Sequence, residues 1–324
     1  MSHPSRSRAR QVGHARPTRV ASCARLLLAA GFVSLAAPRL GAQTLDDGVM
    51  VSPHQLRTTV MFGREQWDQY WEGTLKRSND NIGTLTTRTM SWMGAYGLSK
   101  NVSLVATLPY VWTKSSEGVL SSMQGRQDLT VAVKYRAVQT KFANGVTARV
   151  LAVGGVGAPT SNYTPDFLPL SIGMHDRQAF VRGGLYLINH RGFFFDGWGG
   201  HVWRSNVTLD RPAYYTNGQL IESNEVDMPN VANYTASVGY NKGAWCIPVG
   251  IDGQRTLGGG DIRRQDMPFV SNRMNLTEAH AEVMYYLPML PSIQLGVGAA
   301  HVLAGRNVGQ STKLSFGVTH VVHL

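Results

Sequence analysis

Apolar and polar side chains alternate with a period of two residues along most of the chain after residue 50. Between residues 129 and 137, every second side chain is apolar or aromatic, and those between are small, polar or basic. The same alternation recurs over residues 102–112, 232–240, 245–254 and 314–324. A period of two is typical of a β-strand whose two faces have different surroundings, so an all-β fold is predicted.

Reading every such segment predicts twelve strands. They lie near residues 55–70, 82–98, 102–113, 128–138, 146–157, 177–188, 193–205, 231–240, 244–256, 273–287, 292–303 and 311–323. Short turns are expected at 99–101, 139–145, 189–192, 241–243 and 288–291, and longer polar loops at 71–81, 114–127, 158–176, 206–230, 257–272 and 304–310. This strict alternation of short and long connections is typical of outer-membrane barrels. We predict an antiparallel transmembrane β-barrel of about twelve strands (12–14), with both termini on the periplasmic side.

A soluble β-sandwich also has alternating strands, but its connections follow no regular order of lengths. The polar faces here are rich in Gly, Thr and Ser, which suits a water-filled or plugged lumen. Aromatic residues recur near strand ends on the apolar face, at the depth where amphipathic rings favour the lipid headgroups. The candidates for these aromatic girdles are Tyr110, Trp112, Trp203, Tyr240, Trp245 and Tyr285.

The first 42 residues have the features of an export signal. An arginine-rich stretch without acids precedes a twelve-residue apolar core, Leu26 to Ala37, which is too short to span a bilayer. We expect cleavage after Ala42, which leaves residues 43–324 as the barrel and lowers the formal charge from +11 to about +4. The alternative is a basic tail that stays attached. Because this segment carries seven of the eleven net positive charges, the barrel itself is only mildly basic, and we predict no nucleic-acid partner.

Three short segments between residues 90 and 200 carry a resemblance to a known family. They are residues 94–98 (GAYGL) with 108–110 (LPY), residues 125–135 (GRQDLTVAVKY), and residues 157–160 (GAPT), where Ser161 follows in place of the usual Gly. These segments resemble outer-membrane transporters named for the meta-cleavage pathway of phenol degradation, which are related to barrels that transport fatty acids and aromatic compounds. The resemblance implies a barrel in the bacterial outer membrane and transport of small solutes, hydrophobic or aromatic ones among them.

The chain departs from this pattern at both ends. Related fatty-acid transporters carry a long N-terminal hatch, whereas about a dozen residues precede the first strand of the mature chain. The last residue is Leu324, not the aromatic residue common at the end of such barrels.

Charged and histidine side chains fall on the predicted lumen faces. The lumen-lining candidates are Lys134, Arg136, Arg149, Arg182, Glu278, His280, Glu282 and Lys313. The spacing of Glu278, His280 and Glu282 would suit a divalent metal or a proton relay, but a polar ladder paired with basic residues on other strands is the interpretation we favour. We therefore assign no metal site and no cofactor. The predicted lumen faces carry slightly more bases than acids, which favours anionic solutes.

The predicted function is an outer-membrane channel for passive uptake or efflux of small solutes. Its expected partners are outer-membrane lipids, a small-molecule solute and the barrel-assembly machinery. One alternative is a structural or surface-interaction barrel without transport. The other is a barrel hydrolase such as a phospholipase, which needs a Ser–His pair at the lipid boundary. The nearest cluster is His201 with Ser205, four residues apart and so about 13 Å apart on a strand. We therefore assign no catalytic residue and predict that the chain is not an enzyme.

Overall fold

The computed structural model describes residues 45–216, 218–263 and 268–324, all of which belong to one compact unit, 38–324. The predicted signal segment, 1–42, lies outside the described residues, and so does its cleavage site. Within the described ranges, no helix has the length and apolarity needed to cross a membrane.

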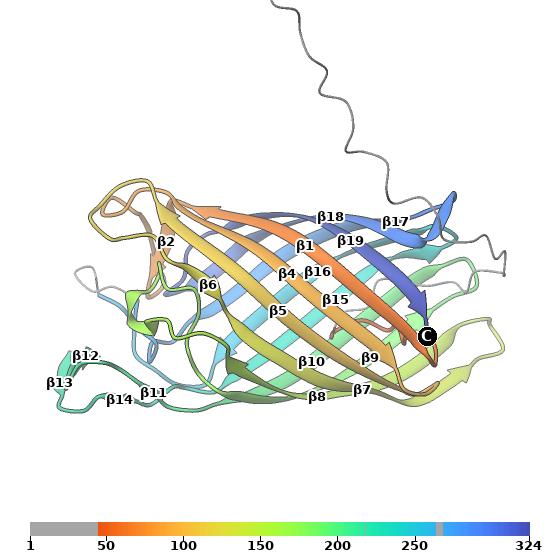
Figure 1. The fold of residues 1–324 in the computed structure, drawn as a ribbon, viewed down its shortest axis with the longest axis horizontal. Helices are drawn as coiled ribbons and strands as arrows, with labels where there is room; N and C mark the ends of the chain where they lie inside the picture. Colours follow the sequence, from red (N-terminus) through yellow and green to blue (C-terminus); the bar gives the residue numbers. More distant parts are fainter. Residues whose placement is uncertain (1–44, 217, 264–267) are drawn as a thin grey trace, which may run out of the picture. The chain divides into compact units, whose positions relative to one another are not determined.

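Twelve strands of the described residues form one closed antiparallel barrel (Figure 1). They are β1 (Gln55–Trp67), β4 (Leu85–Gly97), β5 (Val102–Ser115), β7 (Asp128–Lys141), β8 (Thr147–Pro159), β9 (Gln178–Ile188), β10 (Phe193–Arg204), β15 (Val231–Lys242), β16 (Trp245–Thr256), β17 (Asn275–Leu287), β18 (Leu290–Arg306) and β19 (Thr312–His323). The barrel closes because β1 pairs with β4 on one side and with β19 on the other. The predicted all-β barrel of twelve strands is confirmed.

The connections divide between the two ends of the barrel, short turns at one end and long loops at the other (Figure 1). The long loops hold short elements that the alternation did not predict. They are β2 (Gln69–Glu72), β3 (Leu75–Ser78), β6 (Gln124–Arg126), β11 (Val207–Thr208), β12 (Tyr214–Thr216), β13 (Gln219–Ile221), β14 (Glu225–Val226) and the 3-10 helix η1 (Pro165–Phe167). β6 extends the barrel wall by pairing with the end of β5. In outer-membrane barrels the long loops are external and the short turns periplasmic.

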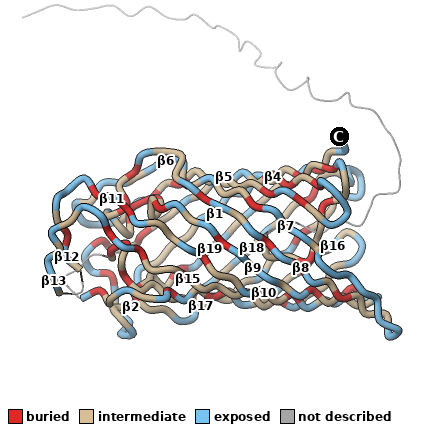
Figure 2. The backbone as a smooth tube through the Cα atoms, turned by 90° about the horizontal axis from the view of Figure 1, so that it is seen from below, coloured by how far each residue is buried: buried red, intermediate tan, exposed pale blue. Residues whose placement is uncertain are grey.

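Burial alternates along the strands as the sequence pattern predicts (Figure 2). On β7, Ala132 and Lys134 point inward and are buried, whereas Val133 and Tyr135 point outward and are exposed. Large apolar side chains such as Phe62 therefore cover the outside of the barrel. An exposed apolar band of this extent needs a lipid environment, and a closed sheet can enter lipid because every strand has a partner on both sides.

The residues before β1 enter the lumen. We call residues 45–54 the N-terminal segment. Leu45 packs against two buried clusters on the inner face of the barrel, and Val51 is almost fully buried in one of them. The sequence indicated only that this segment is short, but its ten residues are enough to fill part of the barrel interior.

Candidate solute path through the lumen

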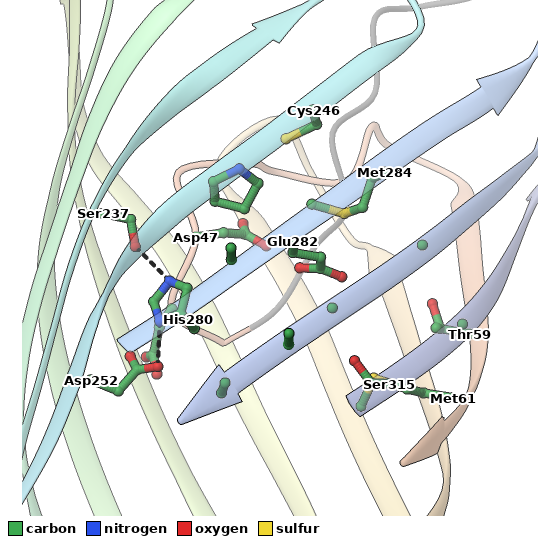
Figure 3. A pocket seen from close by; sticks show the side chains of 18 of the residues that line it. Asp47, Thr59, Met61, Ser237, Cys246, Asp252, His280, Glu282, Met284 and Ser315 are labelled. Atoms are coloured by element: carbon green, nitrogen blue, oxygen red, sulfur yellow. Dashed lines mark hydrogen bonds and ion pairs between the residues drawn. The ribbon is translucent and has the colours of Figure 1, made fainter. Parts of the chain in front are cut away.

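A cavity of about 630 Å³ lies along one side of the lumen (Figure 3). Its walls are the N-terminal segment and inward-facing residues of β1, β4, β10 and β15–β19. The lining mixes hydroxyl groups, such as that of Ser315, with the flexible thioethers of Met61 and Met284 (Figure 3). Gly296, Gly298 and Gly317 also line it and leave that wall without side chains. A cavity of this kind accommodates small molecules of moderate polarity.

The other side of the lumen is filled. Inward-facing residues of β7–β10, with one from β15, form a buried cluster that we call the lumen core. Its members are Ala132, Leu151, Val153, Phe180, Tyr186, Trp198, Val202 and Val231. Leu45 and Met50 of the N-terminal segment pack against it. The N-terminal segment therefore packs against a hydrophobic core formed by side chains of the barrel wall.

Ion pairs anchor the N-terminal segment to this wall. Asp47 accepts a hydrogen bond at 2.7 Å from the Nζ of Lys134, whose side chain is fully buried. Asp46 pairs with Arg182. The Gly48 carbonyl accepts a hydrogen bond at 2.8 Å from Arg149 Nη1. Three of the predicted lumen-lining bases thus hold this segment.

Two close approaches fix the path of the segment. The Gly48 amide donates a hydrogen bond at 3.0 Å to Asp196 Oδ2. A Cβ at Gly48 would lie only 1.9 Å from Cγ of Tyr186, so no larger residue fits without displacing that ring. A Cβ at Gly97 would likewise lie 2.0 Å from the carbonyl oxygen of Ser52. The segment therefore lies against the wall with no room for side chains at these points.

A chain of hydrogen bonds crosses the cavity wall around His280 (Figure 3). Its Nδ1 lies 2.7 Å from Asp252 Oδ2, and its Nε2 lies 3.1 Å from Ser237 Oγ. Thr235 donates a hydrogen bond at 2.7 Å to the other oxygen of Asp252. The order serine, histidine, aspartate is the one found in many hydrolases.

The surroundings of Ser237 differ from those of a catalytic serine. Its side chain is 7% exposed, and its strand pairs with β10 on one side and β16 on the other. Backbone N–H groups in such a ladder bond to the neighbouring strands, so they do not form the oxyanion hole that acyl transfer requires.

The remaining lumen candidates lie at separate places. Glu278 and Lys313 form an ion pair, Nζ to Oε2, of 2.8 Å, while Glu282 lines the cavity. Arg136 lies near the turn at residues 99–101, where it donates hydrogen bonds to the Asn101 side chain and the Lys100 carbonyl. Within the described ranges, no cluster of three or more His, Cys, Asp or Glu side chains has the arrangement of a metal site.

The girdle candidates lie at the two ends of the barrel. Tyr110, Trp112 and Trp203 lie near the long-loop ends of β5 and β10, whereas Tyr240, Trp245 and Tyr285 lie near the short turns. The ring centroids of Tyr110 and Trp112 are 4.5 Å apart, and those of Trp245 and Tyr285 are 4.4 Å apart.

A second cavity, of about 470 Å³, lies under the long loops; we call it the vestibule. Its walls include Trp67, Ile172 and Met174. Glu65 lines both the vestibule and the lumen cavity, so the two spaces lie on either side of this residue. In the loop above, burial raises the pKa of Asp176, which also lines the vestibule.

The charge of the lining has the opposite sign to the one expected from the sequence. The lumen cavity is lined by six acidic residues, Asp46, Asp47, Glu65, Asp196, Asp252 and Glu282, and by fewer bases. The expected excess of bases was wrong because the count left out the N-terminal segment, whose two aspartates neutralise Lys134 and Arg182. The adjacent Asp46 and Asp47, in the short stretch that precedes the first strand, were the available signal.

Comparison with known proteins shows the fold. No protein-family model matches the chain, and no curated protein matches it either. Among solved structures, an outer membrane channel from Pseudomonas putida F1 aligns over 87% of this chain and 100% of its own, with 16% identity and a TM-score of 0.69.

Two more distant barrels differ in what they do. A channel named CymD for monoaromatic hydrocarbons aligns over 85% of this chain and 89% of its own, with 9% identity and a TM-score of 0.37. Outer membrane phospholipase A from Escherichia coli aligns over 81% of this chain and 95% of its own, with 13% identity and a TM-score of 0.39. A fold does not by itself imply a function, so function has to be argued from the lumen. In fold, the chain is similar to the outer membrane channel of Pseudomonas putida F1.

Proposed function

We propose that this chain is an outer-membrane channel that passes small solutes passively, in uptake or in efflux. The observation that carries the proposal is the pair of cavities on either side of Glu65, one beneath the long loops and one beside the N-terminal segment. A structural barrel without transport would need no such space. The export signal at residues 1–42 and a periplasmic position of the short turns are parts of the same proposal.

The N-terminal segment limits the size of the solute. It is held against the lumen core by ion pairs to Lys134 and Arg182, which leaves the space along β15–β19 as the path. The two cavities are each the size of pockets that hold single small molecules. The channel is therefore selective for small solutes and excludes bulky ones.

The lining indicates the chemistry of the solute. Thioether and aromatic groups, such as Met61 and Trp67, alternate with hydroxyl groups, which suits uncharged molecules with an apolar body, small aromatic compounds included. The acidic lining disfavours anions, since carboxylates in a narrow, low-dielectric channel repel them. Among ions, the channel prefers cations.

We also infer membership of the outer-membrane family named for phenol meta-cleavage. The support is the set of residues 94–98, 108–110, 125–135 and 157–160, which resemble that family. In the fold, these segments belong to β4, β5, β6, β7 and β8, which are consecutive in the barrel wall. The resemblance therefore covers one contiguous face, and the solute class it implies agrees with the cavity lining.

The proposal is tested by reconstituting the mature chain in planar bilayers and liposomes. We expect a small single-channel conductance, a reversal potential that shows preference for K⁺ over Cl⁻, and faster entry of a small aromatic alcohol than of a disaccharide. Faster migration of the unheated than of the heated protein on a denaturing gel shows that the barrel is folded. A folded barrel that neither conducts nor admits the alcohol would contradict the proposal and favour a structural role.

A lumenal hydrolase is the second candidate, because Ser237, His280 and Asp252 are in hydrogen-bond order. A fluorophosphonate probe distinguishes the two functions, since it labels an activated serine. Labelling that disappears in Ser237→Ala and His280→Ala would favour the hydrolase. We expect no labelling, because β15 offers no oxyanion hole.

A further inference from the structure

Four basic residues occupy outward positions at the long-loop edge of one wall of the barrel, and one of them, Arg64, also borders the lumen cavity. They are Arg64 on β1, Arg88 on β4, Lys114 on β5 and Arg126 on β6, and all four are exposed. We call them, with Tyr110 and Trp112, the rim patch. Their outward direction follows from the alternation, since their neighbours Glu65 and Thr87 line the vestibule and Thr113 is buried.

The strand register brings these residues together. Arg64 lies directly opposite Arg88, Arg88 opposite Trp112, and Arg126 opposite Tyr110. Directly opposite side chains have Cβ atoms about 5 Å apart. Lys114 lies opposite Thr86, two residues along β4 from Arg88. In Figure 1, β1, β4, β5 and β6 lie side by side in one wall, so the four cations form a compact group.

No carboxylate of the residues that the structure describes forms an ion pair with this group. Within the described ranges, none of the four side chains donates a hydrogen bond or forms an ion pair. The acids on the barrel strands face inward instead, where they line the cavities or pair with lumen groups. Like charges placed directly opposite each other on a sheet are destabilising. The Arg64–Arg88 pair is therefore expected to have an anion from outside the chain.

The groups below the cations identify the kind of anion. The rings of Tyr110 and Trp112, whose centroids are 4.5 Å apart, stand on the strand next to Arg88, and Phe62 and Met90, one step toward the membrane centre, are exposed and apolar. The wall thus presents exposed apolar side chains and, at its long-loop edge, aromatic rings beside the cations. Acyl chains next to a headgroup that joins sugar or glycerol to phosphate match this arrangement.

The rest of the long-loop edge lacks this arrangement. On β8 and β10 the outward residues nearest the loops are Ala158 and Trp203. Arg255 on β16 is exposed, but it lies opposite Ala232 and has no second base facing it. The paired cations therefore mark one wall, not a general basic ring.

We propose that the rim patch binds the phosphorylated headgroup of lipid A, the glycolipid of the external leaflet. Arg64 and Arg88 are spaced to share one phosphate through two-pronged guanidinium hydrogen bonds, with Lys114 and Arg126 beside it. Trp112 and Tyr110 lie against the sugar region. This site is on the outside of the barrel, so it is independent of what the lumen transports.

The test measures binding of lipid A to the purified mature chain by native mass spectrometry. The variant R64Q/R88Q/K114Q/R126Q is compared with a matched variant, K100Q/K141Q/R191Q/K242Q, which loses the same charge from exposed residues at the short-turn end. We expect the first variant to bind bisphosphorylated lipid A at least roughly tenfold more weakly than the wild type does. The second variant should bind it as tightly as the wild type. Dephosphorylated lipid A should bind all three proteins equally.

Competition separates a lipid site from a simple phosphate site. Inorganic phosphate at millimolar concentration should not displace lipid A, because it lacks the apolar contacts to Phe62 and Met90. Equal binding of lipid A to both variants would overturn the proposal, and so would complete displacement by phosphate. The gel shift on heating shows that each variant remains folded, so a loss of binding is attributable to the patch.

Discussion

The two halves of the lumen are built from the same kind of strand but have opposite interiors. On β8, the inward residues Leu151 and Val153 are buried in the lumen core, and the outward residues of the strand are apolar as well. On β19, the inward residues include Ser315 and Gly317, which line open space. The two strands differ in these inward-facing residues, which are large and apolar on β8 and small or polar on β19. The lumen of one barrel can therefore be a packed core on one side and a channel on the other.

The filled half explains why a short N-terminal segment stays inside the barrel. Leu45 and Met50 find apolar partners there, and Asp46 and Asp47 find Arg182 and Lys134. Leaving the lumen would expose the apolar side chains and leave buried Lys134 without its carboxylate, which is unfavourable. The open half offers no equivalent partners, and this is why a path remains along it.

Two ion pairs of similar length allow the sharpest test of this comparison. Lys134–Asp47 lies in the filled half with the lysine side chain fully buried, whereas Lys313–Glu278 lies in the open half with its lysine 37% exposed. Lys134→Met should reduce the free energy of unfolding by about 3–5 kcal/mol, because it leaves a carboxylate without its partner in the lumen core. Lys313→Met should cost about 1 kcal/mol or less, since water reaches that pair.

Urea unfolding of the barrel in lipid vesicles measures both values. Equal losses in the two variants would show that the halves do not differ in hydration.

The next largest effect concerns conductance. In Gly48→Val, the added side chain collides with Tyr186, which lies 1.9 Å from the position of a Cβ at this residue. We expect the N-terminal segment to leave the lumen core and the single-channel conductance to rise severalfold. The matched control is Gly183→Val, because a Cβ at Gly183 meets no atom within 4 Å. A Gly48→Val channel with wild-type conductance would mean that the segment does not limit the path.

A smaller effect is expected on ion selectivity. Glu282 lines the lumen cavity. Glu225 lies on β14 in the long loop 206–230 and lines neither the lumen cavity nor the vestibule. Glu282→Gln should shift the reversal potential toward Cl⁻, because it removes one carboxylate from the wall of the path. Glu225→Gln should leave the reversal potential unchanged. An unchanged potential in Glu282→Gln as well would place the path of ions elsewhere.

The strands could be predicted from the sequence because alternation is a local signal. The predicted segment 193–205 and the observed β10 (Phe193–Arg204) differ by one residue, and the strand order followed from the alternating loop lengths. The same alternation assigned Lys134, Arg149, Arg182, His280 and Glu282 to the lumen side. In the structure Lys134, Arg149 and Arg182 contact the N-terminal segment, and His280 and Glu282 line the lumen cavity.

The partners could not be predicted, since they come from distant parts of the chain. Asp46 meets Arg182 across 136 positions, and no periodic pattern in residues 45–54 indicates that they lie inside the barrel. The group of Ser237, Asp252 and His280 depends on the register of three strands. The register of these strands can be determined only when the turn lengths and the β-bulges are known. One such bulge is the register shift between Thr277 and Glu278 on β17.

The smallest expected effect distinguishes the loops above the two halves by their response to acid. Above the open half, Asp261 accepts hydrogen bonds of 2.7 and 2.6 Å from Arg306, and this contact lowers the pKa of Asp261. Its stabilising contribution is therefore present at neutral pH and is lost as the pH falls through the lowered pKa. Above the filled half, burial raises the pKa of Asp176, so its contribution is greatest at low pH and is lost as the pH rises through the raised pKa.

Acidification should therefore loosen residues 257–263 and tighten residues 174–177. Hydrogen exchange of the two segments, corrected for the intrinsic effect of pH, measures this, and Asp261→Asn should make residues 257–263 insensitive to acid. The change in protection should stay below about tenfold, because the Asp261–Arg306 pair is largely exposed. If exchange became faster in both segments in acid, the loops would respond to the charge of the whole barrel and not to their own aspartates. The difference between the two halves of the lumen would then not extend to the loops above them.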